Sequence, residues 1–423
     1  MKPVYKYSVL FAALLAAYLL FGVGAWLLPD APVRHHVEKT LAEGDLDSDQ
    51  PRAFLPRQQC RMDNFTDALI LNQTLTMTSE SLLDGVLLMP RKSCGLLPFE
   101  DLRALADGHQ EMTTIHYGRY WHGNTFLLRY LLVLYDYISI RLLLYIVTTL
   151  LALWCAVLLW RKCGWTTAAA IMFGLAASYA FMMQFSIQFA PVLILALVGM
   201  IALARQKKPS LLPFFVIGSL TCYFDLLTAP MLTLGLMLLV QAAMMQEGTL
   251  WQGWWRTLHS ALLWAAGYMA TWVTKWLIAT FLTSENVLAD GLRETGNRSG
   301  VLDDYGRWDA VRANLDLLPW QFIVIVVLLL VLLAAFRFHA QGWRRSLQLL
   351  PIALLPWAWY FFTANHSYMH SWFTFRAQAV SIAAILLALM QLIDWKKIKR
   401  SAFGLKIHQN PIQKSTTNDR FLI

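Results

Sequence analysis

Two acidic side chains at the start of one predicted helix are the first candidates for chemistry. Asp63 and Asp67 stand four positions apart within residues 62–72, whose sequence is MDNFTDALILN. Residues at this spacing share one face of a helix, and Asp63 is well suited to cap the helix N-terminus. Asp63 could therefore act only as a cap. Alternatively, Asp63 or its neighbour Asp67 could be a general base that takes a proton from an acceptor hydroxyl.

A second cluster combines cationic and aromatic side chains. Residues 116–123 read HYGRYWHG. Arg119 could hold a phosphate through its planar guanidinium, and His122 could do so when protonated, with Tyr120 between them. The alternative is that this aromatic-rich segment only anchors the chain at the membrane surface.

Two ionisable residues fall within or beside apolar segments. Lys275 lies inside an apolar stretch, and ionisable groups in lipid are costly enough to suggest a function. Its long side chain could instead reach the outer surface. Asp225 lies in a short turn between two apolar segments, where it could pair with Lys275, face a cavity or simply shape the turn.

Two histidines and an arginine form a third cationic group. His366 and His370 are four residues apart, and Arg376 follows. Such a group suits an anionic headgroup or phosphate. Two histidines at this spacing can also bind zinc, but no carboxylate or thiol stands near them in the sequence, so we do not expect a metal site here.

Two of the five cysteines, Cys60 and Cys94, share one predicted loop. In an oxidising compartment they could form a disulfide, which would stabilise the fold by roughly 3 to 4 kcal/mol. They could equally remain free thiols.

The composition indicates a membrane protein. Of the 423 residues, 57% are hydrophobic and 14% are charged, whereas about 25% of the residues in a soluble domain are charged. The net charge of +9 comes from Lys and Arg in short segments that flank apolar runs. This pattern follows the positive-inside rule, so no nucleic-acid partner is expected.

The apolar segments predict an all-α integral membrane fold with about ten spans. These are residues 8–28, 139–160, 166–184, 189–205, 211–224, 229–245, 258–282, 319–337, 347–363 and 374–393. Every loop predicted on the inner side is basic, which places both termini in the cytoplasm.

Two large loops are predicted on the outer side. Residues 29–125 form the first, with short amphipathic helices at about 68–77 and 81–89 that should lie on the membrane surface. Residues 283–318 form the second, whose mixed charge is typical of a solvated helical cover. The membrane domain thus covers residues 1–394, and residues 395–423 form a basic cytoplasmic tail.

Several of these motifs resemble the GT-C superfamily of membrane glycosyltransferases, which includes protein mannosyltransferases and aminoarabinose transferases. The segment that begins at Asp63 is similar to the acidic start of the first outer loop in that class. The chain resembles in particular uncharacterised bacterial members with a Tyr-Trp-His-Gly signature, here 120–123, a Phe-Asp-x-Leu-Thr turn, here 224–228, and a His-Ser-Tyr-x-His segment, here 366–370.

The resemblance implies transfer of a sugar from a polyprenyl-phosphate donor to an acceptor hydroxyl outside the bacterial inner membrane. Asp63 would be the base of an inverting reaction, and the cationic residues above would hold the donor phosphate. The acceptor would be a glycan, a lipid or a protein. No cofactor is implied, and a divalent metal is not expected, because Asn64 stands where many members carry a second acid.

Two other functions fit the same residues. A transporter or flippase of a lipid-linked or anionic substrate would use Lys275 and Asp225 within the membrane. Its substrate site should lie near the middle of the bilayer, whereas the polar residues of this chain are concentrated on the outer side. A structural or assembly subunit without catalysis would tolerate the loss of Asp63.

Overall fold

The computed structural model is almost entirely helical, which confirms the predicted all-α class. It describes residues 3–48, 58–245, 248–301 and 304–398. Within those ranges the only sheet is an antiparallel pair, β1 (Pro90–Ser93) and β2 (Thr113–His116), with Pro90 opposite His116. Most of the tail 395–423 lies outside the described residues.

The helices connect in a simple order along the chain. They are α1 (Pro3–Trp26), α2 (Asp30–Ala42), η1 (Gln58–Cys60), α3 (Asn64–Thr76), η2 (Met77–Ser79), α4 (Leu82–Leu87), α5 (Pro98–Ala106), α6 (Gly123–Leu132), α7 (Tyr137–Cys163), α8 (Trp165–Ala177), η3 (Ala180–Phe185), α9 (Ala190–Ala204), α10 (Leu212–Phe224), α11 (Pro230–Met244), α12 (Leu250–Leu282), α13 (Val287–Ser299), α14 (Arg307–Leu315), α15 (Trp320–Phe336), α16 (Gly342–Gln348), α17 (Leu350–Phe362), α18 (Ala364–Met369), α19 (Ser371–Thr374), η4 (Phe375–Ala377) and α20 (Gln378–Gln391).

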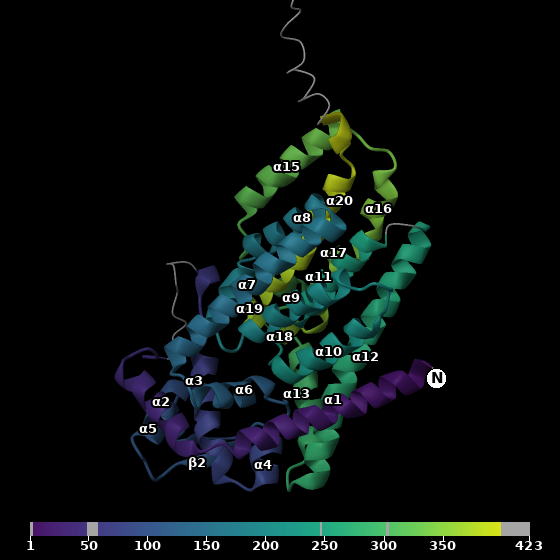
Figure 1. The fold of residues 1–423 in the computed structure, drawn as a ribbon. Helices are drawn as coiled ribbons and strands as arrows, with labels where there is room; N and C mark the ends of the chain where they lie inside the picture. Colours follow the sequence, from purple (N-terminus) through teal and green to yellow (C-terminus); the bar gives the residue numbers. More distant parts are fainter. Residues whose placement is uncertain (1–2, 49–57, 246–247, 302–303, 399–423) are drawn as a thin grey trace, which may run out of the picture.

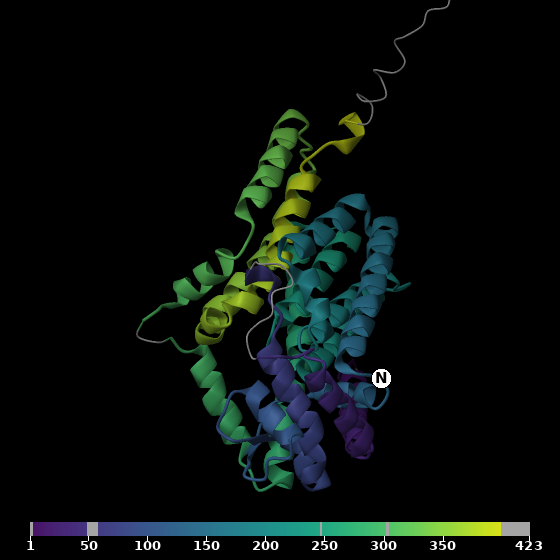
Figure 2. The ribbon, with the colours of Figure 1, turned by 90° about the vertical axis from the view of Figure 1, so that its left-hand side faces the viewer.

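The helices form two regions. The elements from α2 to α6 gather at the lower end of the molecule in Figure 1, and a bundle that includes α7 to α11, α17 and α20 rises above them. Helix α15 leans out along one side of the bundle, as the turned view in Figure 2 also shows. The first outer loop of the prediction is therefore a folded region of its own.

Among the described residues, three helical segments are long and apolar enough to cross a bilayer. They are Tyr5–Trp26, Tyr137–Cys163 and Ser371–Gln391. Helices α14 and α15 would supply a fourth if counted together, although they bend by 82° at their junction. The structure thus has several apolar helices, of which three or four reach a spanning length.

The apolar segments between 165 and 245 form shorter helices than predicted. Helices α8 to α11 have 13 to 15 residues each, which corresponds to about 20 Å at 1.5 Å per residue. Proline in the first turn limits the start of α9, α10 and α11, because proline is tolerated there and not further inside a helix.

Helix α3 differs most from its predicted setting. The segment 68–77 was expected on the membrane surface, but nearly every residue of α3 is buried. Its polar side chains have partners inside the protein: the Asn72 amide exchanges two hydrogen bonds with the Lys92 backbone at 2.9 Å, and Thr76 donates to the Pro90 carbonyl. The prediction that 68–77 lies on the membrane surface is therefore wrong, because the polar side chains of α3 form hydrogen bonds with the backbone of β1.

Two glycines let α10 and α12 approach closely. A Cβ atom on Gly218 would clash with the backbone of Trp264, and one on Gly267 would clash with the backbone of Phe215. Small residues allow apolar helices to pack at short range. This contact fixes α12, and α12 in turn carries α13, which packs against α18.

Candidate functional site

A cavity of about 520 Å³ gathers polar side chains from distant parts of the chain. Its lining comes from the start of α3, the residue before α5, the segment after β2, the segment between η3 and α9, the turn after α10, helix α13, and the stretch from α18 to α19. The lining residues are Asp63, Phe65, Thr66, Leu69, Leu97, Tyr117, Gln188, Leu226, Arg298, His366, His370, Trp372 and Phe373. The cavity therefore unites Asp63 with the two histidines of the C-terminal segment.

Asp63 is the N-cap of α3 and also borders this cavity. Its Oδ1 accepts from the backbone N–H of Thr66 at 3.0 Å, and its Oδ2 accepts from the Thr66 hydroxyl at 2.6 Å. Burial raises the pKa of the Asp63 carboxyl, while the Thr66 hydrogen bonds and the charge of Arg376 oppose that rise. The capping interpretation is correct, and the same carboxylate faces the cavity.

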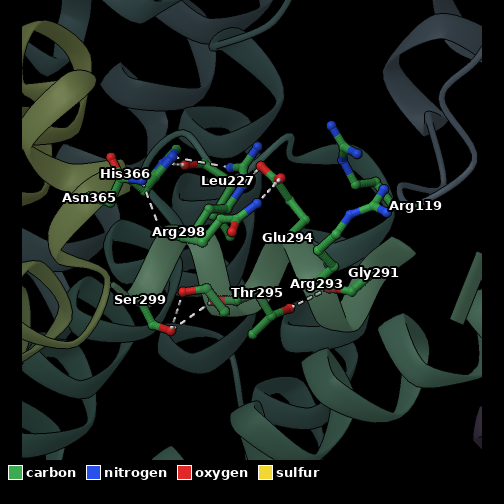
Figure 3. A network of polar contacts seen from close by, with 12 residues as sticks. Arg119, Leu227, Gly291, Arg293, Glu294, Thr295, Arg298, Ser299, Asn365 and His366 are labelled. Carbon is green, nitrogen blue, oxygen red and sulfur yellow. Dashed lines mark hydrogen bonds and ion pairs between the residues drawn. The ribbon is translucent and has the colours of Figure 1, made fainter. Parts of the chain in front are cut away.

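Arg298 provides the cavity's positive charge. Its Nε donates to Oε1 of Glu294 at 2.8 Å, and its Nη1 donates to Nδ1 of His366 at 3.1 Å. The guanidinium also lies 5.7 Å from the centre of the Tyr120 ring. Figure 3 shows Glu294 and His366 on either side of Arg298, so its orientation is fixed by groups on two different helices.

His366 is held in one neutral tautomer. A carbonyl only accepts, so the 2.7 Å contact between Nε2 and the Leu227 carbonyl places the ring proton on Nε2. Nδ1 is then free to accept from Arg298. Burial, together with the charge of Arg298, holds the pKa of His366 well below its usual value.

His370 is also neutral at pH 7. Burial, with Arg298 nearby, lowers its pKa to about 4, and its ring centre lies 4.9 Å from that of His366. The predicted cationic pair is therefore wrong in its charge, because both rings are buried beside an arginine. In this geometry both rings line the cavity, and His366 also holds Arg298.

A second cavity, of about 430 Å³, adjoins the first through Arg298. Its other lining is largely apolar and comes from α11, α12, α13 and α17: Leu227, Met231, Leu234, Ala261, Leu262, Trp264, Ala265, Tyr268, Met269, Trp272, Thr295, Ser299, Trp359 and Thr363. We call it the apolar groove. Arg298 is thus the one side chain in the described part of the chain that lines both the groove and the Asp63 cavity.

The turn after α10 separates the two cavities. Leu226 lines the Asp63 cavity and Leu227 lines the apolar groove. Leu227 has a φ of +71°, in the left-handed region that a leucine rarely adopts. This conformation accompanies the hydrogen bond between its carbonyl and His366, so one residue contributes its side chain to the groove and its carbonyl to the cavity wall.

Asp225 begins this turn and does not line either cavity. Its Oδ1 accepts from the backbone N–H of Thr228 at 2.9 Å and also from the Thr228 hydroxyl. Burial raises the pKa of Asp225 to about 6. The predicted alternatives of pairing with Lys275 or facing a cavity are not realised, and Asp225 shapes the turn.

Lys275 is fully buried in α12, away from both cavities. Its Nζ donates to the Leu87 carbonyl at 2.6 Å and lies 5.4 Å from the centre of the Trp121 ring. The side chain therefore does not reach the surface, and it tethers α4 to α12 in place of binding a ligand.

Arg119 helps to hold the region from α2 to α6 against α12. Its guanidinium pairs with Asp290 at 3.0 Å, and its carbonyl accepts from the indole N–H groups of Trp272 and Trp276 at 3.0 and 2.9 Å. Arg119 does not line the cavity, so the predicted phosphate contact is not made by this residue.

The Tyr-Trp-His-Gly motif at 120–123, which follows Arg119, is also structural. His122 is buried, its Nε2 lies 2.7 Å from the Tyr117 carbonyl, and burial lowers its pKa to about 3. A neutral, enclosed imidazole is unsuited to binding phosphate. Tyr120 supports Arg298 from outside the cavity, whereas Tyr117 reaches the lining itself.

Asp67 faces away from the cavity. It accepts from the Tyr137 hydroxyl at 2.7 Å and is fully buried. Burial raises the pKa of Asp67 to about 6, against the lowering effects of Arg141 and Tyr137. Although Asp63 and Asp67 are only four residues apart, Asp63 lines the cavity and Asp67 does not.

Arg376 lies behind the cavity wall. Its Nη2 donates to the carbonyls of Gln59 and Arg61 at 3.2 Å each, while its Nε and Nη1 have no hydrogen-bond partner among the described residues. Arg376 thus holds the segment that precedes Asp63 in place. Its positive charge also lowers the pKa of the Asp63 carboxyl.

Cys60 and Cys94 are not joined by a disulfide in the structure. Cys60 is buried in η1, whereas the backbone N–H of Cys94 donates to Asp101 at 2.8 Å in the turn after β1. Of the two alternatives left open by the sequence, the disulfide is therefore not the one that the structure shows. No group of three His, Cys, Asp or Glu side chains converges within the described ranges.

Sequence reasoning missed Arg298 as a site residue. Glu294 and Arg298 have the i, i+4 spacing of a solvated ion pair on a helix, and the mixed charge of residues 283–318 indicates a solvated cover. Only the packing of α13 against α18 brings Arg298 to His366. The sequence feature that could have indicated this site is the mixed-charge loop 283–318, taken together with the polar segment that contains His366 and His370.

Comparisons with models of known protein families, with curated proteins and with solved structures found no match.

Proposed function

We propose that this chain is a membrane glycosyltransferase of the GT-C type, which transfers a sugar from a polyprenyl-phosphate donor to an acceptor hydroxyl. The observation that carries the proposal is the shared position of Arg298. This one cation borders an apolar groove and a polar cavity that contains a buried carboxylate. The proposed donor has three parts in a matching order. Its hydrocarbon tail corresponds to the apolar groove, its phosphate to Arg298 and its sugar to the polar cavity.

The apolar groove fits the donor's tail. Leu262 and Met269 line it and are also exposed on the molecular surface, so a polyprenyl chain can enter sideways without leaving the bilayer. Thr295 and Ser299 lie at the end of the groove near Arg298. Their hydroxyls donate to backbone carbonyls of α13, Thr295 to Gly291 and Ser299 to Thr295, at 2.8 Å each, so the Arg298 guanidinium is the donor that would meet the phosphate.

Arg298 would hold the phosphate and stabilise its charge as the sugar departs. Charge that develops on a leaving group is stabilised best by a donor that is already oriented. Glu294, His366 and the Tyr120 ring fix the guanidinium before any ligand binds. The neutral state of His366 leaves the phosphate charge to Arg298.

Asp63 would be the general base. The acceptor oxygen attacks C1 of the sugar, the bond from C1 to the phosphate oxygen breaks, and the acceptor proton passes to the Asp63 carboxylate. A direct displacement of this kind inverts the anomeric centre. The raised pKa of Asp63 favours this role, because a stronger base accepts the proton more readily.

The proposed topology has about ten spans, with Asp63 and Arg298 on the outer side. Shorter helices such as α8 to α11 would cross together with their flanking segments. The basic segments at 161–162, 205–208 and 337–345 would then face the cytoplasm. The apolar surface of α15, which includes Phe322, would face lipid.

Transfer of labelled sugar from polyprenyl-phosphate donors to acceptor-bearing membranes tests the proposal. Wild type should transfer label, and Asp63→Asn should lose transfer, since asparagine keeps the helix cap but is not a base. Asp84→Asn is the matched control, because Asp84 lies in the same region on α4 and does not line the cavity.

Two results would count against this function. Transfer retained by Asp63→Asn would remove the base role of that residue. Absence of transfer by wild type with every donor tested would favour the alternative, a transporter or flippase of a lipid-linked substrate, for which the apolar groove and Arg298 would serve equally well.

A further inference from the structure

A third cavity shares no lining residue with the Asp63 cavity or the apolar groove. It has a volume of about 490 Å³ and forms where the start of α8, the segment before and into α16, and the end of α20 meet. These elements stand together at the upper end of the molecule in Figure 1. Nothing in the proposed glycosyl transfer uses this cavity.

The charges around this cavity are predominantly positive. Arg345, Lys396 and His339 line it, and neither Arg345 nor Lys396 forms an ion pair with another described residue. The only carboxylate in the lining belongs to Asp394. It accepts from the backbone N–H of Lys397 at 3.1 Å and lies 3.6 Å from the Lys397 ammonium. The two lining cations are therefore available to a ligand anion.

The N-terminus of α8 adds to this positive character. Thr166 and Thr167 line the cavity in the first turn of this 13-residue helix. Gly164, at the N-cap, provides no side-chain hydrogen bond. The free N–H groups of a helix start, with the helix dipole behind them, favour an anion.

The cavity also offers an acceptor. The Oε1 atom of Gln391 is buried and has no hydrogen-bond partner among the described residues, although buried polar atoms are normally paired. An oxygen of this kind calls for a donor from the ligand, such as a hydroxyl. Trp165 and Trp395 meet edge to face at 4.7 Å beside the cavity, and paired indoles of this kind suit the headgroup layer of a membrane.

We propose that this cavity binds the phosphodiester headgroup of an anionic glycerophospholipid that carries free hydroxyls. The phosphate lies between Arg345, Lys396 and the start of α8, and a headgroup hydroxyl donates to Gln391. Basic pockets between helices on the cytoplasmic side are suited to anionic headgroups. The choice of a lipid over a free phosphate rests on the proposed membrane topology; the anion site itself does not.

Lipid binding to the full-length protein in detergent micelles tests this site. Native mass spectrometry with added phosphatidylglycerol or phosphatidylcholine should show selective retention of phosphatidylglycerol. The double variant Arg345→Gln and Lys396→Gln should weaken that binding by about thirtyfold, the combined effect of two juxtamembrane charges. Both residues are exposed, so the variant should fold.

The matched control is the double variant Arg337→Gln and Arg344→Gln. It removes the same charge from exposed positions close to the cavity, but neither of these described side chains lines it or forms an ion pair with Asp394, so it should retain phosphatidylglycerol. Equal weakening by both double variants would mean diffuse surface charge and would overturn the site. Equal retention of the two lipids by wild type would overturn headgroup recognition.

Inorganic phosphate separates the two sources of the anion. Phosphate that displaces phosphatidylglycerol at millimolar concentration and binds the lipid-free protein equally well would overturn the lipid assignment. Weak displacement would support it. The same measurements on Asp63→Asn should give the same result, so failure of glycosyl transfer and failure of this lipid site are distinguishable.

Discussion

The Arg298 guanidinium donates to Nδ1 of His366 across 3.1 Å, while Nε2 of the same ring contacts the Leu227 carbonyl at 2.7 Å. A histidine that bridges a donor and an acceptor in this way must be neutral and of one tautomer. The ring therefore links the turn at Leu227 to Arg298, so the position of the turn determines the position of the guanidinium. Because the ring is neutral, the positive charge of the cavity comes from Arg298.

Loss of Arg298 should impair transfer far more than loss of a neighbouring arginine. Arg298→Gln is expected to lower kcat/KM by about 100- to 1000-fold, the effect of removing one oriented donor from a developing charge. Arg293→Gln, on the same helix but mostly exposed and outside both cavities, should change kcat/KM by less than about threefold. Comparable losses in both variants would contradict the assignment of the phosphate site.

Substitution of Asp67 should affect stability, not chemistry. Asp67→Asn should lower the free energy of unfolding by about 1 to 3 kcal/mol, because a buried acceptor of the Tyr137 hydroxyl is replaced. The KM of the folded fraction should not change. Denaturation of Asp67→Asn, Tyr137→Phe and the double variant should show coupling between the two sites; additive losses would indicate that the bond contributes little.

The acid limb of the pH profile should report the titration of Asp63. A general base works only when deprotonated, so kcat/KM falls as pH drops through its pKa, which burial has raised. The charge of Arg376 opposes that rise, so Arg376→Gln should move the acid limb to higher pH. Arg376→Lys should move it less, since the charge remains. An unmoved limb in Arg376→Gln would show that Arg376 does not influence the titrating group.

Blocking the apolar groove should discriminate between donors of different chain length. Ala265 lines the groove, whereas the adjacent Ala266 does not and is exposed. Ala265→Trp should raise KM for a long polyprenyl donor by at least about tenfold, or roughly 1.4 kcal/mol, with a smaller effect on a short-chain donor. Ala266→Trp is the control. A uniform rise for all donors would indicate distortion of α12 instead of a blocked tail site.

The helical class and the cap at Asp63 were predictable because they depend on local sequence. Apolar runs and a paucity of charge require helices in a membrane protein, and an Asp with a Thr three residues later favours a helix start. The spacing of Asp63 and Asp67 could not decide which of them meets the cavity, because that depends on Tyr137, a distant residue, which engages Asp67.

Most of the other site residues depend on tertiary packing. His366 and His370 look cationic in the sequence, but burial beside Arg298 makes them neutral. The segment around Arg119 looks like a phosphate site, but Asp290 and two tryptophans of α12 occupy its polar groups. Arg298 was missed for the converse reason, since an ion pair within one helix gives no sign of what the helix packs against.

The position of Arg298 between groove and cavity has a consequence for turnover. Sugar transfer would convert the donor's phosphodiester, with a single negative charge, into a phosphate monoester with about −1.5 to −2. The same guanidinium would then hold the spent lipid more tightly than the incoming donor. The polyprenyl phosphate would therefore inhibit the reaction as a product. Its lateral release past Leu262 and Met269 would be the rate-limiting step of turnover.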